Sequence, residues 1–389
     1  MSRSAKFYDF IFISLIIYAI FDMQTSQVTG NAGVSRTNTH LALILLIGLH
    51  GVFLFLSIAK RRHFYVTATA GITILITLWI LILDVFCEID LWTMLTHCGL
   101  SALWMFAQYF YSVYPDNHAC VIERIQKRFF LLLLVYAVGI VYYMIQMWVT
   151  KGRLLVSNLA YNMLVLLPWF YVPSAKDRDK VATIIVAIFT LITLKRGAII
   201  AFVLMFLFAM SALGKIKNQQ NKYIGRLILL SSVFIIVACI VDSYLGGALF
   251  SRFTVSQMQG GSGRTDMYKL ILEALSERNI TTLFFGTGSG SSSLLLGTGA
   301  HNEWLEFLYS FGIVGVGLYF CLLISMIKQT LKLKRYSSEM YIPIAMSTIY
   351  FTCVGLYGGM YFVQSSYFLF ALIGYSNYRL NEELMEYEK

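Results

Sequence analysis

Long apolar runs alternate with short polar breaks along almost the whole chain. Most of these runs are long enough to cross the hydrocarbon core of a bilayer as a helix, which takes about 20 residues. They predict twelve membrane helices, at about residues 7–23, 40–59, 64–83, 91–114, 129–149, 158–172, 181–194, 197–213, 227–245, 303–327, 341–359 and 362–377. Because no segment shows the alternating pattern of a membrane β-strand, we expect an all-α integral membrane protein.

The longest break in the hydrophobic pattern, residues 246–302, separates the ninth and tenth predicted helices. Its segment 264–279 has the spacing of an amphipathic helix, which we expect to lie at the membrane interface and roof a cavity. The apolar positions on one face of this helix are Tyr268, Ile271, Leu272 and Leu275. A stretch rich in glycine and serine, residues 286–299, follows and leads into the tenth membrane helix.

The composition agrees with a membrane protein, since 58% of the residues are hydrophobic, 13% are charged and the mean hydropathy is +0.70. The net charge of +10 does not indicate a nucleic-acid partner, because Lys and Arg cluster in the breaks between apolar runs. On alternate sides of the predicted helices the 30 basic residues divide into 21 and 9. The positive-inside rule places the richer side, and with it both termini, in the cytoplasm.

The nine basic residues on the outer side need a functional explanation, because topology disfavours them there. Lys195 and Arg196 interrupt an otherwise apolar stretch between the seventh and eighth predicted helices. Two adjacent cations at this place are costly unless they meet an anion, and the planar fork of an arginine suits two phosphate oxygens. The pair fits either a phosphate or diphosphate clamp or an anchor for lipid headgroups, because long basic side chains reach the interface easily.

Arg264 is a second candidate for anion binding. It follows the flexible segment 260–263 (GGSG) and opens the amphipathic helix of the long loop. A helix amino terminus attracts anions through its free N–H groups and its dipole. The sequence leaves two interpretations open, an anion site or a turn with a solvated arginine.

His301, followed by Asn302 and Glu303, stands where the long loop enters the tenth predicted helix. A histidine that gains and loses a proton near neutral pH suits a general base acting on a sugar hydroxyl. The alternative is a structural histidine, which is the interpretation we favour for His50 and His97 inside the membrane spans.

Acidic residues are scarce on the outer side. We expect Asp84, Glu88 and Asp90 in a solvated turn, and no pair of carboxylates has a spacing that indicates catalysis. The six cysteines show no CxxC or other metal-binding spacing. The sequence therefore indicates neither a metal nor a cofactor.

Residues 285–320 (FGTGSG…GAHNEWLEFLYSFGIVGVGLYF) combine three features in order. A glycine-rich segment comes first, HNEWL (301–305) follows, and the next helix carries GIVG (312–315). This arrangement resembles the signature region of the O-antigen polymerase and O-antigen ligase superfamily, in which a Gly-rich segment precedes His-Asn-x-x-Leu and Gly-Ile-x-Gly.

Two upstream segments extend the resemblance. Residues 193–202 (TLKRGAIIAF) resemble the Ser-Arg-Gly hinge of the family, with Lys195 in the serine position, and residues 261–268 (GSGRTDMY) are similar to its arginine-bearing loop. The resemblance is close over about residues 180–330, whereas the preceding part matches only in hydropathy. We therefore expect three parts: N-terminal membrane helices in 1–180, a polymerase- or ligase-like core with loop 246–302 in 181–340, and C-terminal helices with a cytoplasmic tail in 341–389.

The resemblance implies a metal-independent, inverting glycosyltransferase of the membrane-embedded GT-C type that uses no cofactor. Its donor would be an oligosaccharide on undecaprenyl diphosphate, at the outer face of the bacterial inner membrane. Arg196 and Arg264, with Lys195 adding charge, would bind the diphosphate. His301 would position or deprotonate the acceptor hydroxyl, supported by its neighbours Asn302 and Glu303. Besides membrane lipids, the candidate partners are the chain-length regulator and the flippase of the same pathway.

The resemblance leaves the acceptor open. A polymerase extends another lipid-linked repeat unit, whereas a ligase transfers the glycan to the lipid A core. The aromatic and acidic sequence HNEWLEFLYSFGIVG is more typical of polymerases, which makes a polymerase the first hypothesis and a ligase the alternative. A flippase or other transporter would place charges along a path inside its spans, and the predicted spans are nearly free of charge.

Overall fold

The computed structural model describes residues 3–28, 37–59, 67–113, 118–151, 156–173, 179–216, 218–251, 253–254, 264–336 and 338–387. The chain folds into two compact units. Unit 1 comprises Met1–Asp116, Arg264–Gln329 and Gly355–Lys389, and unit 2 comprises Asn117–Gly263 and Thr330–Val354. Each unit combines segments that are far apart in the sequence. The three parts expected from the sequence (1–180, 181–340 and 341–389) stay a prediction.

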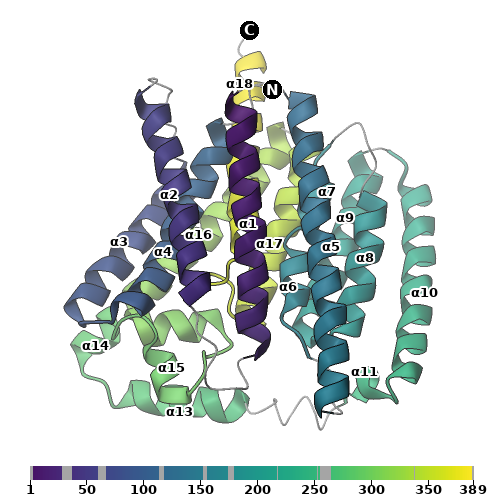
Figure 1. The fold of residues 1–389 in the computed structure, drawn as a ribbon. Helices are drawn as coiled ribbons and strands as arrows, with labels where there is room; N and C mark the ends of the chain where they lie inside the picture. Colours follow the sequence, from purple (N-terminus) through teal and green to yellow (C-terminus); the bar gives the residue numbers. More distant parts are fainter. Residues whose placement is uncertain are drawn as a thin grey trace. The chain divides into compact units, whose positions relative to one another are not determined.

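Unit 1 is built around one central helix, α4, which packs against α2, α3 and α18, while α1 packs on α2 (Figure 1). Its helices are α1 (Arg3–Val28), α2 (Thr37–Ala59), α3 (Ala68–Phe86), α4 (Leu91–Val113), α13 (Arg264–Ser276), α14 (Ile280–Phe285), α15 (Ser291–Leu296), most of α16 (Glu303–Tyr336) and α18 (Ser366–Tyr387). The start of α1 and the end of α18 lie at one end of this unit, and α13, α14 and α15 gather at the other end (Figure 1).

The contact between α4 and α18 combines apolar packing with satisfied polar groups. Trp104 is fully buried, stacks on Phe370 and donates a hydrogen bond from Nε1 to the carbonyl of Tyr361 at 2.7 Å. The two helices also approach closely at Gly374, where a Cβ atom would lie 2.8 Å from Cα of Gln108. Small residues that allow close backbone approach are typical of helix interfaces inside membranes.

Unit 2 consists of α5 (His118–Lys151), α6 (Leu159–Leu164), α7 (Leu167–Phe170), α8 (Asp179–Ile192), α9 (Arg196–Ile216), α10 (Gln220–Tyr244), α11 (Ala248–Ser251) and most of α17 (Ser338–Tyr357). Helix α8 packs against α5, α6 and α7, and α9 packs against α10. A cluster of buried residues joins α8, α9, α10 and α11: Leu191, Leu194, Ile199, Ala238 and Leu249.

The structure confirms an all-α membrane protein, with no β-strand among the described residues. In this part of the chain, seven helices are long and apolar enough to cross a membrane, judged by length and composition: α2, α3, α5, α9, α10, α16 and α17. Each of the twelve predicted segments coincides with helical structure, but the count of twelve crossings and the GT-C type stay predictions.

For two helices, a proline or a helix cap explains a difference from the predicted extent. The predicted helix 158–172 is divided into α6 and α7. The cause is Pro168, which has no backbone N–H to donate and whose ring would collide with the preceding turn of a continuous helix. Helix α3 starts at Ala68, later than predicted, because the side chain of Thr67 caps it by accepting a hydrogen bond from Ala70 N at 3.2 Å.

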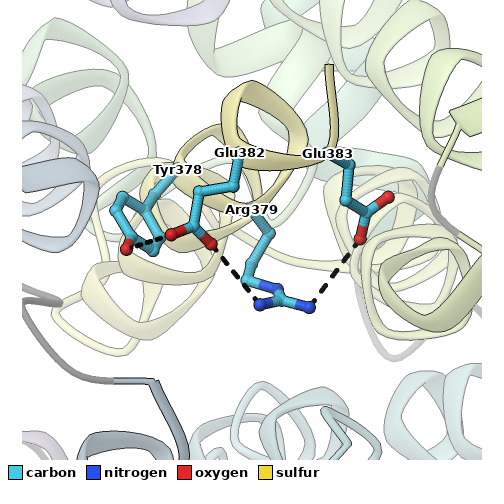
Figure 2. A network of polar contacts seen from close by, with 4 residues as sticks. All are labelled: Tyr378, Arg379, Glu382 and Glu383. Carbon is cyan, nitrogen blue, oxygen red and sulfur yellow. Dashed lines mark hydrogen bonds and ion pairs between the residues drawn. The ribbon is translucent and has the colours of Figure 1, made fainter. Parts of the chain in front are cut away.

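Helix α18 continues beyond the apolar segment that ended the prediction at residue 377. Figure 2 shows the polar contacts along its last turns. Tyr378 donates to Glu382 at 2.6 Å, and Arg379 forms ion pairs with Glu382 and Glu383 at 3.5 and 3.8 Å. Pairs three and four residues apart stabilise a helix by about 0.2–0.5 kcal/mol each, which supports the polar end of α18.

Helix α16 is broken at Gly312, whose φ of 67° and ψ of −169° lie outside the helical region. The nine residues from Glu303 to Phe311 therefore form a separate short helix before the longer apolar segment. A Cβ atom on Gly312 would lie 2.6 Å from the backbone N of Gly286 and would also collide with the carbonyl of Phe284. Only glycine combines this backbone conformation with so close an approach.

Gly312→Ala should lower the free energy of unfolding by more than about 2 kcal/mol. The alanine would have to keep a positive φ, which strains its backbone, and its Cβ would collide with neighbouring backbone atoms. The measurement is the melting temperature of each purified variant in detergent. Gly317→Ala in the same helix is the matched control, since no atom lies within 4 Å of its Cβ position. Equal melting temperatures for the two variants would contradict this account of the break.

Candidate functional site

The glycine-rich segment docks on the break in α16. The backbone N–H groups of Thr287 and Gly288 both donate to the carbonyl of Ser310, at 3.0 and 2.9 Å. Gly286 has a φ of 91°, and a Cβ atom there would lie 2.6 Å from Cα of Phe311. The two glycine motifs of the signature sequence are therefore in direct backbone contact.

Two side chains bind the neighbouring carbonyls at the end of the short helix. Arg278 donates to the carbonyl of Tyr309 at 2.7 Å and to Oγ1 of Thr287 at 2.9 Å, while its guanidinium lies 3.8 Å from the centre of the Tyr309 ring. Trp79 on α3 donates from Nε1 to the carbonyl of Phe311 at 3.1 Å. A cation at the carboxyl end of a helix is favoured by the helix dipole, so Arg278 has a structural role here.

The turn between α3 and α4 holds the other side of the glycine-rich segment. Asp84 is fully buried and accepts a hydrogen bond from Ser289 N at 2.8 Å, which corrects the expectation of a solvated carboxylate. Gly288 lies against Ile89, where an added Cβ would come within 2.8 Å of that side chain. Local sequence patterns carry no signal for this contact, because its partners are about two hundred positions apart.

Asp90 matches the solvated turn that was expected. It is exposed, and its Oδ1 accepts hydrogen bonds from the backbone N of Trp92 and of Thr93, both at 3.0 Å, at the start of α4. Its hydrogen bonds with Thr93 hold the pKa of its carboxyl below the usual range. Asp90 is therefore a helix cap, and Glu88 beside it is also exposed.

The amphipathic helix predicted at 264–279 is present as α13. Ile271 and Leu275 are buried and form a small core with Ala300, the residue before His301. Leu272, which was predicted on the same face, is 55% exposed. The buried face of α13 thus packs on protein, with the first residues of α16 and with α14 and α15, and only the remaining apolar side chains are left for a membrane interface.

His301 is held at the junction between the loop and α16. Its φ of 51° is left-handed, a conformation that few residues other than glycine adopt. Tyr268 on α13 donates from its hydroxyl to the carbonyl of His301 at 3.4 Å. Asn302 caps α16 by accepting from Leu305 N at 3.2 Å. The backbone at His301 is therefore held from α13 on one side and by the helix cap on the other, and the residue is partly exposed.

Glu303, the first residue of α16, is 1% exposed. Its carboxylate accepts a hydrogen bond from Met360 N in the connection between α17 and α18. Gly355 and Gly359 lie beside it, with Cβ positions 3.8 and 3.7 Å from Glu303 atoms, which is ordinary van der Waals contact. Glu303 thus ties the start of α16 to the α17–α18 connection, and its supporting role beside His301 stays a prediction.

Arg264 is the first residue of α13 and is half-buried. It stands one helical turn before Tyr268, the residue that contacts His301. Helix α13 therefore links the predicted loop arginine to the predicted base within unit 1. The glycines at 260–263, which suggested a flexible anion loop, lie outside the described residues.

Lys195 and Arg196 belong to unit 2 and form the turn between α8 and α9. Leu194 is buried in the cluster of this unit with a left-handed φ of 54°, which reverses the chain ahead of the two cations. The carbonyl of Lys195 accepts from Ala198 N at 3.0 Å, and its Nζ lies 5.7 Å from the centre of the Tyr161 ring. Arg196 is the first residue of α9 and half-buried.

The other histidines singled out in the sequence have local partners. His50 is buried, with Nδ1 2.8 Å from the carbonyl of Leu46 and Nε2 3.0 Å from the hydroxyl of Tyr367. His97 lies 3.0 Å from the carbonyl of Thr93 through Nδ1. These contacts agree with the structural interpretation of both residues.

Sequence reasoning missed one residue of this site, Glu306. Its carboxylate contacts the backbone before His301 and two serines of the neighbouring segments. The available signal was an acidic residue in the first turn of α16. That position is also the usual one for a solvated glutamate near a helix amino terminus, so the sequence did not distinguish the two.

These features define an all-α membrane protein in which a glycine-rich segment is docked on a broken helix with a histidine at its start. Residues 181–320 match the protein family whose model is described as O-antigen ligase. The match confirms the resemblance and supports membership of the O-antigen ligase and polymerase superfamily, whose members are glycosyltransferase-like enzymes. No curated protein matches the chain.

Arg278→Ala should lower the free energy of unfolding by about 3 kcal/mol, because it leaves two charge-assisted hydrogen bonds unmade. The measurement is thermal unfolding in detergent, with limited proteolysis of the 286–299 segment as a second readout. Lys269→Ala, which removes an exposed cation of α13, is the matched control. An Arg278→Ala protein as stable and as protease-resistant as the control would contradict the structural role of this arginine.

Proposed function

We propose that the protein is a polysaccharide polymerase of the inner membrane. It transfers an undecaprenyl-diphosphate-linked glycan to the acceptor sugar of another lipid-linked repeat unit at the outer membrane face. The observation that carries the proposal is the placement of His301, which is clamped by α13 and by the cap of α16 inside a region that matches the family. A fixed, partly exposed histidine suits a base that must meet a hydroxyl in one orientation.

In the proposed reaction the acceptor hydroxyl oxygen attacks the anomeric carbon of the donor sugar. The bond from that carbon to the diphosphate oxygen breaks as the new glycosidic bond forms, with inversion at the carbon. His301 takes the hydroxyl proton, and the undecaprenyl diphosphate leaves with the bonding electrons. The positively charged side chains stabilise the charge that develops on the departing diphosphate.

Arg196 and Arg264 are the proposed ligands of the diphosphate, with Lys195 adding charge. Each arginine is the first residue of a helix, α9 or α13, and therefore lies at the positive end of its dipole. That field disfavours a guanidinium on its own, whereas an anion bound there is attracted by both the side chain and the free N–H groups. This local electrostatic pattern supports anion binding over a simple solvated turn.

The proposed topology has both termini in the cytoplasm and the site outside. Within unit 1, the start of α1 and the end of α18 lie at the end opposite to α13, α14 and α15 (Figure 1). That separation supports a loop on the outer side, where lipid-linked glycans and the chain-length regulator are expected partners.

An O-antigen ligase, which transfers the glycan to the lipid A core, is the second candidate. The family match fits a ligase and a polymerase equally, whereas the aromatic and acidic sequence after His301 is more typical of a polymerase. The two differ in the acceptor and share the proposed roles of Arg196, Arg264 and His301. A flippase finds no comparable support.

In a deletion strain complemented with variants, Arg196→Ala, Arg264→Ala and His301→Ala should each lose long glycan chains while protein levels hold. Removing a charge-stabilising donor or a general base reduces turnover by about 10²-fold or more. The measurement is the polysaccharide ladder on a gel, with membrane immunoblots for expression and Lys269→Ala as the control. Normal ladders from all three variants would end the assignment of the site.

The same gel separates the two candidate functions. Loss of a polymerase leaves a single repeat unit on the lipid A core. Loss of a ligase leaves bare core and polymer that remains on undecaprenyl diphosphate. The second pattern in the deletion strain would replace the polymerase by the ligase.

Transfer by the purified protein should persist at full rate in EDTA, because the arginines supply the charge stabilisation that a metal ion provides in other transferases. The measurement is transfer from a lipid-linked repeat unit in proteoliposomes with and without EDTA. Activity that disappears in EDTA and returns with a divalent cation would contradict a metal-independent mechanism.

A further inference from the structure

Glu306 lies in the short helix 303–311 and joins three parts of unit 1. Its Oε2 accepts a hydrogen bond from the backbone N of Ala300 at 3.1 Å. Its Oε1 accepts from the hydroxyl of Ser292 on α15 at 2.5 Å and, more weakly, from that of Ser310 at 3.3 Å. Both carboxylate oxygens are thus used as acceptors, and each contact is charge-assisted.

The contact with Ala300 bears directly on His301, the next residue. Ala300 is fully buried in one cluster with Ile271 and Leu275 of α13, so its position is set by packing as well as by Glu306. The left-handed φ of His301 follows immediately. A non-glycine residue keeps such a conformation only when its surroundings hold it there, and Glu306 supplies the contact on the amino-terminal side.

The contact with Ser292 connects the same carboxylate to the glycine-rich segment. Helix α15 lies within that segment, and Ser291 at its start donates to the carbonyl of Gly288 at 2.9 Å. The glycine-rich segment is itself bonded to the end of the short helix at Ser310. Glu306 therefore closes a ring of contacts that runs from α16 through α15 and back to the residue before His301.

We propose that Glu306 is a positioning residue for His301, holding the backbone that aims the imidazole at the acceptor hydroxyl. The inference rests on the proposed function, because it names a second residue of the same site. Glu306 touches neither donor nor acceptor in this role. It should therefore affect the rate of the transfer step and leave substrate binding nearly unchanged.

Glu306→Ala in proteoliposomes should lower kcat by about 10²-fold, the loss expected when a catalytic group moves by about 1 Å. The KM for the lipid-linked donor should stay within about twofold, because the residue makes no contact needed for binding. Glu273→Ala, which removes an exposed carboxylate of α13, is the matched control and should keep the wild-type rate. An unchanged kcat in Glu306→Ala would overturn the proposal.

Glu306→Gln tests whether geometry or charge matters. A glutamine oxygen can still accept from Ala300 N, and its amide can donate to the hydroxyl of Ser292, which rotates to accept. This variant should therefore recover most of the activity lost in Glu306→Ala. A glutamine variant as inactive as the alanine one would overturn the positioning role, because the charge itself would then be required.

Ser292→Ala keeps the test open if Glu306→Ala does not fold. It removes one hydrogen bond of the ring and should lower kcat by about fivefold, in line with the loss of a single contact. In a His301→Ala background, adding Ser292→Ala should change the residual rate by less than about twofold, since the positioned group is gone. An equal loss in both backgrounds would indicate a purely structural contact and overturn the proposal.

The failures of the two proposals are distinguishable. A His301→Ala protein with the wild-type rate overturns the proposed function, whatever Glu306 does. An inactive His301→Ala protein combined with wild-type kcat in Glu306→Ala and Ser292→Ala overturns only the role of Glu306.

Discussion

The backbone contact between Gly286 and Gly312 is the constraint on which the arrangement around His301 depends. It breaks α16 and leaves a short helix with His301 at its start and the glycine-rich segment at its end. Carbonyls near the break accept hydrogen bonds from the glycine-rich segment, from Arg278 and from Trp79. A continuous helix would offer these acceptors to its own N–H groups, so the loop would lose its docking point.

Three carboxylates secure the same region, two of them buried (Asp84 and Glu303) and one half-buried (Glu306). Asp84 binds Ser289 N, Glu303 binds Met360 N, and Glu306 binds Ala300 N. Each carboxylate thus accepts a hydrogen bond from a backbone N–H group in a segment that lies outside the long helices. In surroundings of low polarity, a backbone N–H group without a partner costs free energy. A hydrogen bond to a carboxylate removes that cost and keeps the loop in place. The three contacts explain how a loop next to apolar helices keeps a defined shape.

The cations divide into two groups with different physical settings. Arg278 is placed at the carboxyl end of the short helix, where the dipole and two acceptors stabilise it. Arg196 and Arg264 stand at amino ends of helices, where the dipole opposes a positive side chain and favours a bound anion. The sign of the helix end thus distinguishes the structural Arg278 from the two arginines that we propose as diphosphate ligands, although the sequence count places all three on the outer side.

Local sequence patterns were enough to predict the helical membrane class, the approximate positions of the helices including α13, the cation pair Lys195–Arg196, and His301 as a candidate base. These features depend on local hydrophobic periodicity or on short motifs, which a single chain segment displays. The break at Gly312, the burial of Asp84 and the contacts of Glu306 were decided by the tertiary structure. Each depends on a partner distant in sequence or on a backbone conformation imposed by packing, as Asp84 with Ser289 and Gly312 with Gly286 illustrate. Periodicity carries no information about such partners, because an acidic residue in a solvated turn and one that binds a buried N–H group look alike in the sequence.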